Sequence, residues 1–281
     1  MEATSRLLPL ICAVFFSQPA AAFSGSDLSA LIDTTPAGGT LTLTAGTYDS
    51  DAPILIRKDL EITGPATAIV QAELQIIGVT VHIVGVTLHQ IPRVAATNPD
   101  IAPWMYQDAQ IAVRTGGQIW IDDLTADAAP GSAKSFIYSA TGSVFIRAVH
   151  KPTIISYLAV PAITIKAWYN SYLMLISFTQ NGTNTRVTVY TNGQNAGVYV
   201  VSSQITMLSA TIVSTTAGGT QCLSLSRAAI ATVHGTSAFY NCAIGVSYEH
   251  AAQAWIDGTV TYYQVLEKWH HWIFTAEQTL R

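Results

Sequence analysis

Two adjacent carboxylates, Asp122 and Asp123, are the first residues in this 281-residue chain whose types could do chemistry. Glycoside hydrolysis needs two carboxyl groups held about 5–9.5 Å apart, and a calcium site needs several clustered oxygen ligands. One adjacent pair satisfies neither requirement, and Asp127 lies too far along the chain to be counted with it. We therefore interpret the pair as a solvated turn and keep both residues as catalytic candidates.

Three further candidates emerge when similar segments of the chain are aligned. The alignment places Asp122 over Arg147 and His234 over Asp257, and the intervening segments contribute Ile176 and Ser209 to the same column. A His–Asp pair can act as a general base with its orienting carboxylate. The alternative is an exposed ion pair worth less than about 1 kcal/mol, and we favour this alternative because the column is interrupted.

Aromatic side chains offer a second kind of chemistry. The alternation of the predicted strands turns several of them outward: Trp120, Phe145, Trp168, Tyr169, Tyr172 and Trp255. Aromatic rings can stack on sugar rings, but an exposed apolar patch can equally be a protein interface. We favour the interface and keep glycan binding as the alternative for Trp120, Phe145, Trp168 and Trp255.

A repeated unit must position these residues. Each unit contains a short apolar alternation, a small polar turn and a second alternation, and it recurs at 111–122, 136–147, 198–209, 222–234 and 244–257. Spacing of roughly 22–27 residues is typical of a solenoid. The antiparallel sandwich, which would show hairpin turns instead, is the rival. The side chains expected to point inward are Ile111, Val113, Ile119, Ile121, Phe136, Val144, Ile146, Val198, Val200, Leu223, Leu225, Val233, Ile244, Val246 and Ile256.

The opening of the chain carries a family resemblance. A short amphipathic helix at Ser26–Ile32, capped by Ser26 or Asp27, precedes PAGGTLTLTAGTY at 36–48 and KDLEITG at 58–64. This order resembles the N-terminal cap and first rungs of right-handed parallel β-helices of the pectin-lyase-like superfamily. The resemblance extends to about Thr261 and implies three strands per rung, about eight or nine rungs and a dry aliphatic interior.

The enzymes of that superfamily carry signatures that this chain mostly lacks. Pectate-lyase-like members have calcium-binding acids with a nearby Arg or Lys, and polygalacturonase-like members have Asn-Thr-Asp, Asp-Asp and Gly-His-Gly. Only Asp122-Asp123 and Val233-His234-Gly235 occur here, so no catalytic role is carried over. No cofactor is expected, calcium entering only if the protein is a lyase, and the histidine spacing predicts no metal site.

Composition narrows the function classes. Charged residues make up 11% of the chain and hydrophobic residues 49%, whereas an average soluble domain is about 25% charged. This composition excludes disorder and provides too few charges for a helical bundle. The net charge of −4 without a basic run argues against nucleic acid as a partner.

Residues 1–22 predict a secretory signal. Arg6 precedes an apolar stretch at 7–16, and Ala20–Ala22 fits a cleavage site; a retained apolar helix is the alternative. The stretch is too short to span a bilayer. The mature chain would keep Cys222 and Cys242, whose spacing of about one repeat would place them on adjacent coils. A one-residue offset in the alignment would turn the two side chains to opposite faces, so the sequence leaves open whether they form a disulfide.

The chain is thus divided into a signal at 1–22, a β-helix at 23–261 and an aromatic cap at 262–281, helical or extended. Loops are expected at 91–107 and around 180–197. We expect a non-catalytic structural or adhesive protein that is secreted or at the cell surface, with the periplasm as the alternative location. It would bind itself, a surface glycan or another protein. The alternatives are a polysaccharide lyase or glycoside hydrolase, and a virion or appendage spike subunit.

Overall fold

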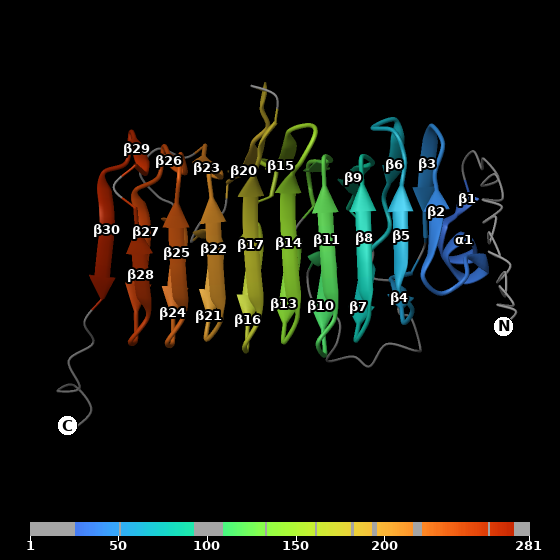
Figure 1. Cartoon of the computed structure of the whole chain (residues 1–281), viewed down its shortest axis with the longest axis horizontal. Helices are drawn as coiled ribbons and strands as arrows, with labels where there is room; N and C mark the ends of the chain where they lie inside the picture. The colour runs from blue at the N-terminus through green and yellow to red at the C-terminus, as the bar shows by residue number, and fades with distance from the viewer. Residues whose placement is uncertain are drawn as a thin grey trace, which may run out of the picture.

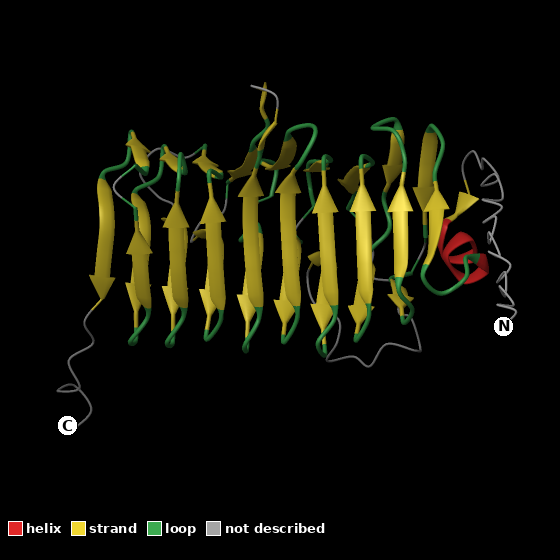
Figure 2. Ribbon diagram, in the orientation of Figure 1, coloured by secondary structure: helices red, strands yellow, loops and turns green. Residues whose placement is uncertain are grey.

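The chain folds into a parallel β-helix. The computed structural model describes residues 26–50, 52–92, 109–132, 134–160, 162–180, 183–192, 196–215, 221–257 and 259–272. Three parallel sheets run the length of the coil, and each full turn of the chain contributes one strand to each sheet (Figures 1 and 2). The expected fold class is confirmed, and the antiparallel sandwich is excluded.

We name the sheets A, B and C. Sheet A contains β1 (Ser26–Asp27), β3 (Gly46–Asp49), β6 (Ala68–Val70), β9 (Thr87–Gln90), β12 (Thr125–Ala128), β15 (Thr153–Tyr157), β20 (Val187–Thr191), β23 (Thr211–Ser214), β26 (Ala238–Tyr240) and β29 (Thr261–Tyr263). Sheet B contains β2 (Gly39–Thr42), β5 (Leu60–Thr63), β8 (Thr80–Val84), β11 (Gln118–Asp122), β14 (Ser143–Ala148), β17 (Tyr172–Ser177), β22 (Gln204–Leu208), β25 (Ile230–His234) and β28 (Gln253–Ile256). Sheet C contains β4 (Ile54–Ile56), β7 (Leu74–Ile77), β10 (Ala109–Arg114), β13 (Ser135–Ala140), β16 (Ile165–Trp168), β21 (Ala196–Val201), β24 (Gln221–Ser226), β27 (Ile244–Glu249) and β30 (Glu267–Trp272).

The coil is right-handed. In Figure 1 the near strands of sheet B point upward while the chain advances from right to left, and sheet C returns downward behind them. The nine strands of sheet B correspond to nine coils of the described chain, within the expected number.

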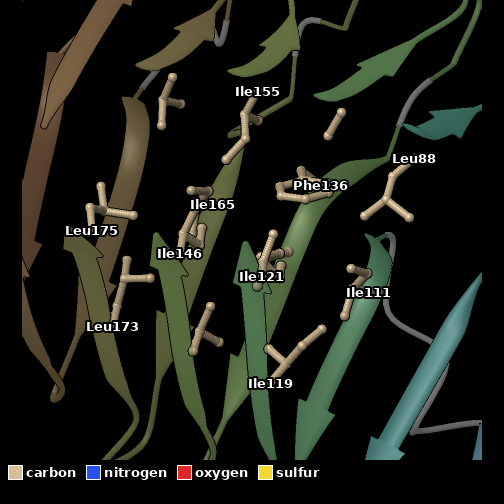
Figure 3. Packing of buried hydrophobic residues seen from close by; sticks show 14 of the residues in the cluster. Leu88, Ile111, Ile119, Ile121, Phe136, Ile146, Ile155, Ile165, Leu173 and Leu175 are labelled. Carbon is tan, nitrogen blue, oxygen red and sulfur yellow. The ribbon is translucent and has the colours of Figure 1, made fainter. Parts of the chain in front are cut away.

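The interior is filled by the residues that the period-two pattern predicts. Thirteen of the fifteen expected inward side chains are fully buried; Ile244 and Ile256, in the last coils, are partly buried. Figure 3 shows aliphatic side chains from all three sheets meeting between them, with Ile119 and Ile121 pointing inward from β11. Each coil stacks only on the coils before and after it, which makes the stack cooperative along its axis.

The N-terminal end is closed by a helix. Helix α1 (Leu28–Thr34) is capped by Asp27, whose carboxylate accepts a hydrogen bond from the Ser29 amide at 2.9 Å. Leu28, Leu31 and Ile32 form the buried side of the helix. The expected helix, its cap and its apolar face are confirmed, with the helix ending two residues later than expected.

The insertion expected around 180–197 is partly described by the structure. Strands β18 (Thr179–Gln180) and β19 (Thr183–Asn184) pair antiparallel, so the insertion expected around 180–197 begins with a small hairpin. The signal at 1–22 and nearly all of the loop expected at 91–107 lie outside the described residues.

The end of the chain is extended where it is described. Helical spacing of Leu266 and Trp269 suggested a helix as one form of the cap, but residues 267–272 form strand β30, which pairs parallel with β27. The helical form is therefore wrong for these residues. Pairing with an available sheet edge satisfies the backbone hydrogen bonds of the segment, which outweighs a weak helical pattern.

Candidate functional site

The outer face of sheet B gathers most of the candidate residues. Parallel in-register pairing stacks equivalent positions of successive coils into columns, about 4.8 Å apart. One column contains Glu61, His82, Trp120 and Phe145 from β5, β8, β11 and β14. In the neighbouring column Asp122 of β11 pairs with Arg147 of β14. We call these residues of the two columns the charged cluster.

Asp122 is the centre of the charged cluster. Its two oxygens accept hydrogen bonds from Arg147, one of them from Nε at 2.7 Å, and Oδ2 also lies 2.8 Å from His82 Nε2. The residue is only 5% exposed. Burial alone would raise the pKa of Asp122, but the hydrogen bonds from His82 and Arg147 outweigh it and lower the pKa below its ordinary value. A carboxylate held in this way is a weak base and a poor proton donor.

His82 connects two carboxylates and was not among the predicted residues. Its Nδ1 lies 3.5 Å from Glu61 Oε1, opposite the nitrogen that contacts Asp122. Glu61 in turn accepts a hydrogen bond from the Thr40 hydroxyl at 2.8 Å. The imidazole occupies the space between the two carboxylates, where a glycosidase would need room for its substrate. Extending the repeat alignment back to 60–63 and 80–84 would have placed both residues beside Trp120.

Trp120 is stacked against neighbouring side chains on the outer face of sheet B. The Trp120 and Phe145 rings are nearly parallel, with centroids 3.9 Å apart, and the Arg147 guanidinium lies 4.4 Å from the Trp120 ring centroid. Tyr172 meets Phe145 edge-on at 5.8 Å. Neighbouring coils thus occupy ring faces that a sugar would need, so Trp120 and Phe145 act as an intramolecular stack.

Asp123 has a structural task. It adopts a left-handed backbone conformation with φ of 56°, which turns the chain at the end of β11. Its carboxylate accepts hydrogen bonds from the amides of Val149 at 2.6 Å and His150 at 3.0 Å. The carboxylate therefore ties together the turns of two successive coils, and it does not join Asp122 in the charged cluster.

His234 and Asp257 come together only loosely. Their closest side-chain atoms, Nδ1 and Oδ2, are 3.9 Å apart, and both side chains are exposed. Hydrogen bonds from the Thr259 backbone and side chain lower the pKa of Asp257. The column between the two candidate pairs contains Ile176 and Leu208. The expected Ser209 is wrong for this column, since β22 ends at Leu208 and Ser209 takes a left-handed turn with φ of 56°.

The other two aromatic candidates lie apart from the charged cluster. Trp168 belongs to β16 in sheet C, on a different face of the coil. Trp255 is in β28, at the last position of the column that contains Trp120, and is 54% exposed. Trp168 therefore does not share a face with Trp120, Phe145 and Trp255.

Cys222 and Cys242 are joined by a disulfide, with Cα atoms 5.6 Å apart. Cys222 lies in β24, whereas Cys242 lies between β26 and β27. Both side chains are completely buried. Because Cys242 precedes the strand that pairs with β24, the offset found in the sequence does not turn the two residues to opposite faces.

Within the described ranges, no three His, Cys, Asp or Glu side chains are arranged to hold a metal ion. None of the helices in those ranges is long and apolar enough to cross a membrane. The chain matches no protein-family model, no curated protein and no solved structure.

Proposed function

We propose that the protein is an exported, non-catalytic β-helix that assembles with further copies of itself through the lateral face of sheet B. The observation that carries this proposal is an apolar patch on the outer face of strands β17, β22, β25 and β28. Its members project outward from successive coils and are at least partly exposed: Met174, Ile176, Leu208, Ile230 and Trp255. Leu208 is 40% exposed.

The composition of the apolar patch favours a protein partner. Exposed apolar surface on a soluble protein usually marks a contact with another molecule. The remaining outward residues of these strands are mostly uncharged, such as Gln204, Thr206 and Thr232, and few charges would have to lose water on contact. A flat sheet face can pack on an identical face about 10 Å away, and a two-fold axis would close such an assembly.

The charged cluster supports a non-catalytic role. Asp122 is bound by Arg147 and His82, and Asp123 is bound by backbone amides. An acid–base catalyst needs a proton donor or acceptor with a pKa near the working pH. The lowered pKa of Asp122 argues against that role.

Light scattering on the protein lacking residues 1–22 tests the proposal. We expect a defined oligomer for wild type and monomers for Leu208→Lys, because a lysine at the centre of the apolar patch would have to be desolvated. Thr63→Lys is the matched control, since Thr63 occupies the same outward column at the other end of sheet B. A monomeric wild-type protein over the whole accessible concentration range would reject self-assembly and leave a glycan or a foreign protein as the partner.

An enzymatic function is the second candidate, and one observation favours it. His82 lies between the carboxylates of Glu61 and Asp122. A carboxylate beside a histidine can orient the imidazole for proton transfer, as in general acid–base catalysis. A polysaccharide lyase or glycoside hydrolase of the pectin-lyase-like superfamily would be the corresponding enzyme, and a spike subunit would share the fold without the activity. Depolymerisation of a polysaccharide panel, with and without calcium, that disappears in His82→Ala would establish the enzyme and reject the non-catalytic proposal.

A further inference from the structure

A hollow opens on the outer face of sheet C, with a volume of about 510 Å³. Its origin is a single small residue. The register places Arg114 of β10, Ala140 of β13 and Trp168 of β16 in one column. Two strand spacings separate the large side chains by about 9–10 Å, and the methyl group of Ala140 leaves the space between them unfilled. The volume is within the usual range for small-molecule sites, about 300–1,000 Å³.

Arg114 lines this hollow and has no acidic partner in the part of the chain that the structure describes. The residue is only 7% exposed, and its Nε and Nη2 atoms are buried without a hydrogen-bond partner. Its one close electrostatic contact in the described chain is the Tyr138 ring, whose centroid is 5.2 Å from the guanidinium carbon. Burial lowers the pKa of Arg114. An unpaired buried charge is costly to keep, which is unexpected unless an anion offsets the cost.

The other walls of the hollow suit an anion carried on a ring. Lys166 adds a second cation, and among the described residues no aspartate or glutamate lines the space. Thr115 provides a hydroxyl group at the turn that follows β10, whereas the Thr141 hydroxyl already donates to the Ala140 carbonyl oxygen. The Trp168 and Tyr169 rings, 5.6 Å apart and edge to face, form an apolar wall that can contact a flat ring.

We propose that this hollow binds an oxyanion, a carboxylate or sulfate ester, that is carried by a sugar-sized ring. Arg114 and Lys166 bind the anionic group, and Trp168 with Tyr169 contacts the ring. Guanidinium groups match the oxygens of such anions with paired hydrogen bonds. The site lies on sheet C, so it does not depend on self-assembly through sheet B, and either proposal can fail while the other holds.

Isothermal titration of the full-length protein tests the site with four probes. Glucose 6-sulfate and glucuronate carry the two anions on the same ring, glucose is the neutral ring, and inorganic sulfate is the anion alone. We expect saturable binding of at least one of the two ring anions, at least about tenfold weaker binding of glucose and of inorganic sulfate, and a raised melting temperature with the bound probe. The comparison of the two ring anions identifies the preferred oxyanion.

Two variants locate the binding in the hollow. Arg114→Met removes the charge and keeps the length of the side chain, and Ala140→Leu fills the hollow while keeping the charge. Both should weaken binding at least about tenfold, whereas Arg57→Met, at an exposed arginine outside the hollow, should leave it unchanged. Arg114→Met should also melt no lower than wild type, because an unpaired buried charge has been removed.

Three outcomes would overturn the proposal. The first is the absence of binding by both ring anions. The second is unchanged binding in Arg114→Met or, if that variant does not fold, in Ala140→Leu. The third is binding of inorganic sulfate as tight as that of glucose 6-sulfate, since the aromatic wall would then have no part in recognition.

Discussion

The two halves of sheet B have the same backbone and opposite surfaces. In strands β5 to β14 the outward positions include the charged cluster, in which each charged group has a partner. In strands β17 to β28 the same columns continue with Met174, Ile176 and Leu208, which have no such partners within the sheet. The backbone thus determines the position of each outward side chain. The residue type alone decides whether that side chain is satisfied by its neighbours or remains available to another molecule.

This difference predicts unequal sensitivity to substitution. Arg147→Met should lower the free energy of unfolding by about 3 kcal/mol, because Asp122 would remain buried with only His82 as a partner. The measurement is chemical denaturation followed by far-UV circular dichroism. The double variant Asp122→Leu/Arg147→Met is the control and should recover most of the loss, since it removes both charges. A double variant as unstable as the single one would show that Arg147 contributes through its packing on Trp120.

Lowering the pH should remove stabilisation that comes from the charged cluster, whereas the apolar patch contributes nothing that titrates. The pKa of Asp122 is lowered in the folded protein, so its contribution to stability is present above its unfolded pKa, near pH 4, and is lost as the pH falls through the folded value. Denaturation midpoints measured between pH 7 and pH 2 should fall less steeply for Asp122→Asn than for wild type, and parallel slopes would contradict the assignment.

The smallest effect is expected in the apolar patch. Ile176 follows Arg147 in the same column, yet Ile176→Thr should change the free energy of unfolding of the monomer by no more than about 0.5 kcal/mol. Denaturation of wild type and Ile176→Thr at a concentration at which both are monomeric isolates this quantity. A loss as large as that of Arg147→Met would mean that the patch stabilises its own coil, and the contrast between the two halves would disappear.

The sequence predicts the interior of this fold better than its surface sites. Alternation at Ile119 and Ile121 specifies which face is buried, because a strand has a side-chain period of two, and the expected pairing of Asp122 with Arg147 is observed. The charged cluster was recognised only in part. Glu61 and His82 precede Trp120 by two coils and one coil, so they lie ahead of 111–122, the first of the aligned repeat units.

Turns account for most of the remaining differences. Leu208, and not Ser209, lies in the column with Ile176 and His234 because β22 ends at Leu208 and the next residue has a left-handed conformation. Thirteen residues other than glycine have positive φ among those described. Such conformations have weak sequence signals outside Gly, Asn and Asp. The hollow beside Arg114 was also beyond sequence reasoning, since it arises from Ala140, a residue without chemistry of its own, standing between two large neighbours.

The disulfide has a mechanical consequence. Since each coil rests mainly on its neighbours, tension applied to the end of the chain would peel coils away one after another. Cys222 and Cys242 are 20 residues apart and joined, so the segment between them cannot lengthen under load. The disulfide thereby prevents about 70 Å of chain from extending under tension. The coil between the two cysteines would detach from the stack as a closed ring.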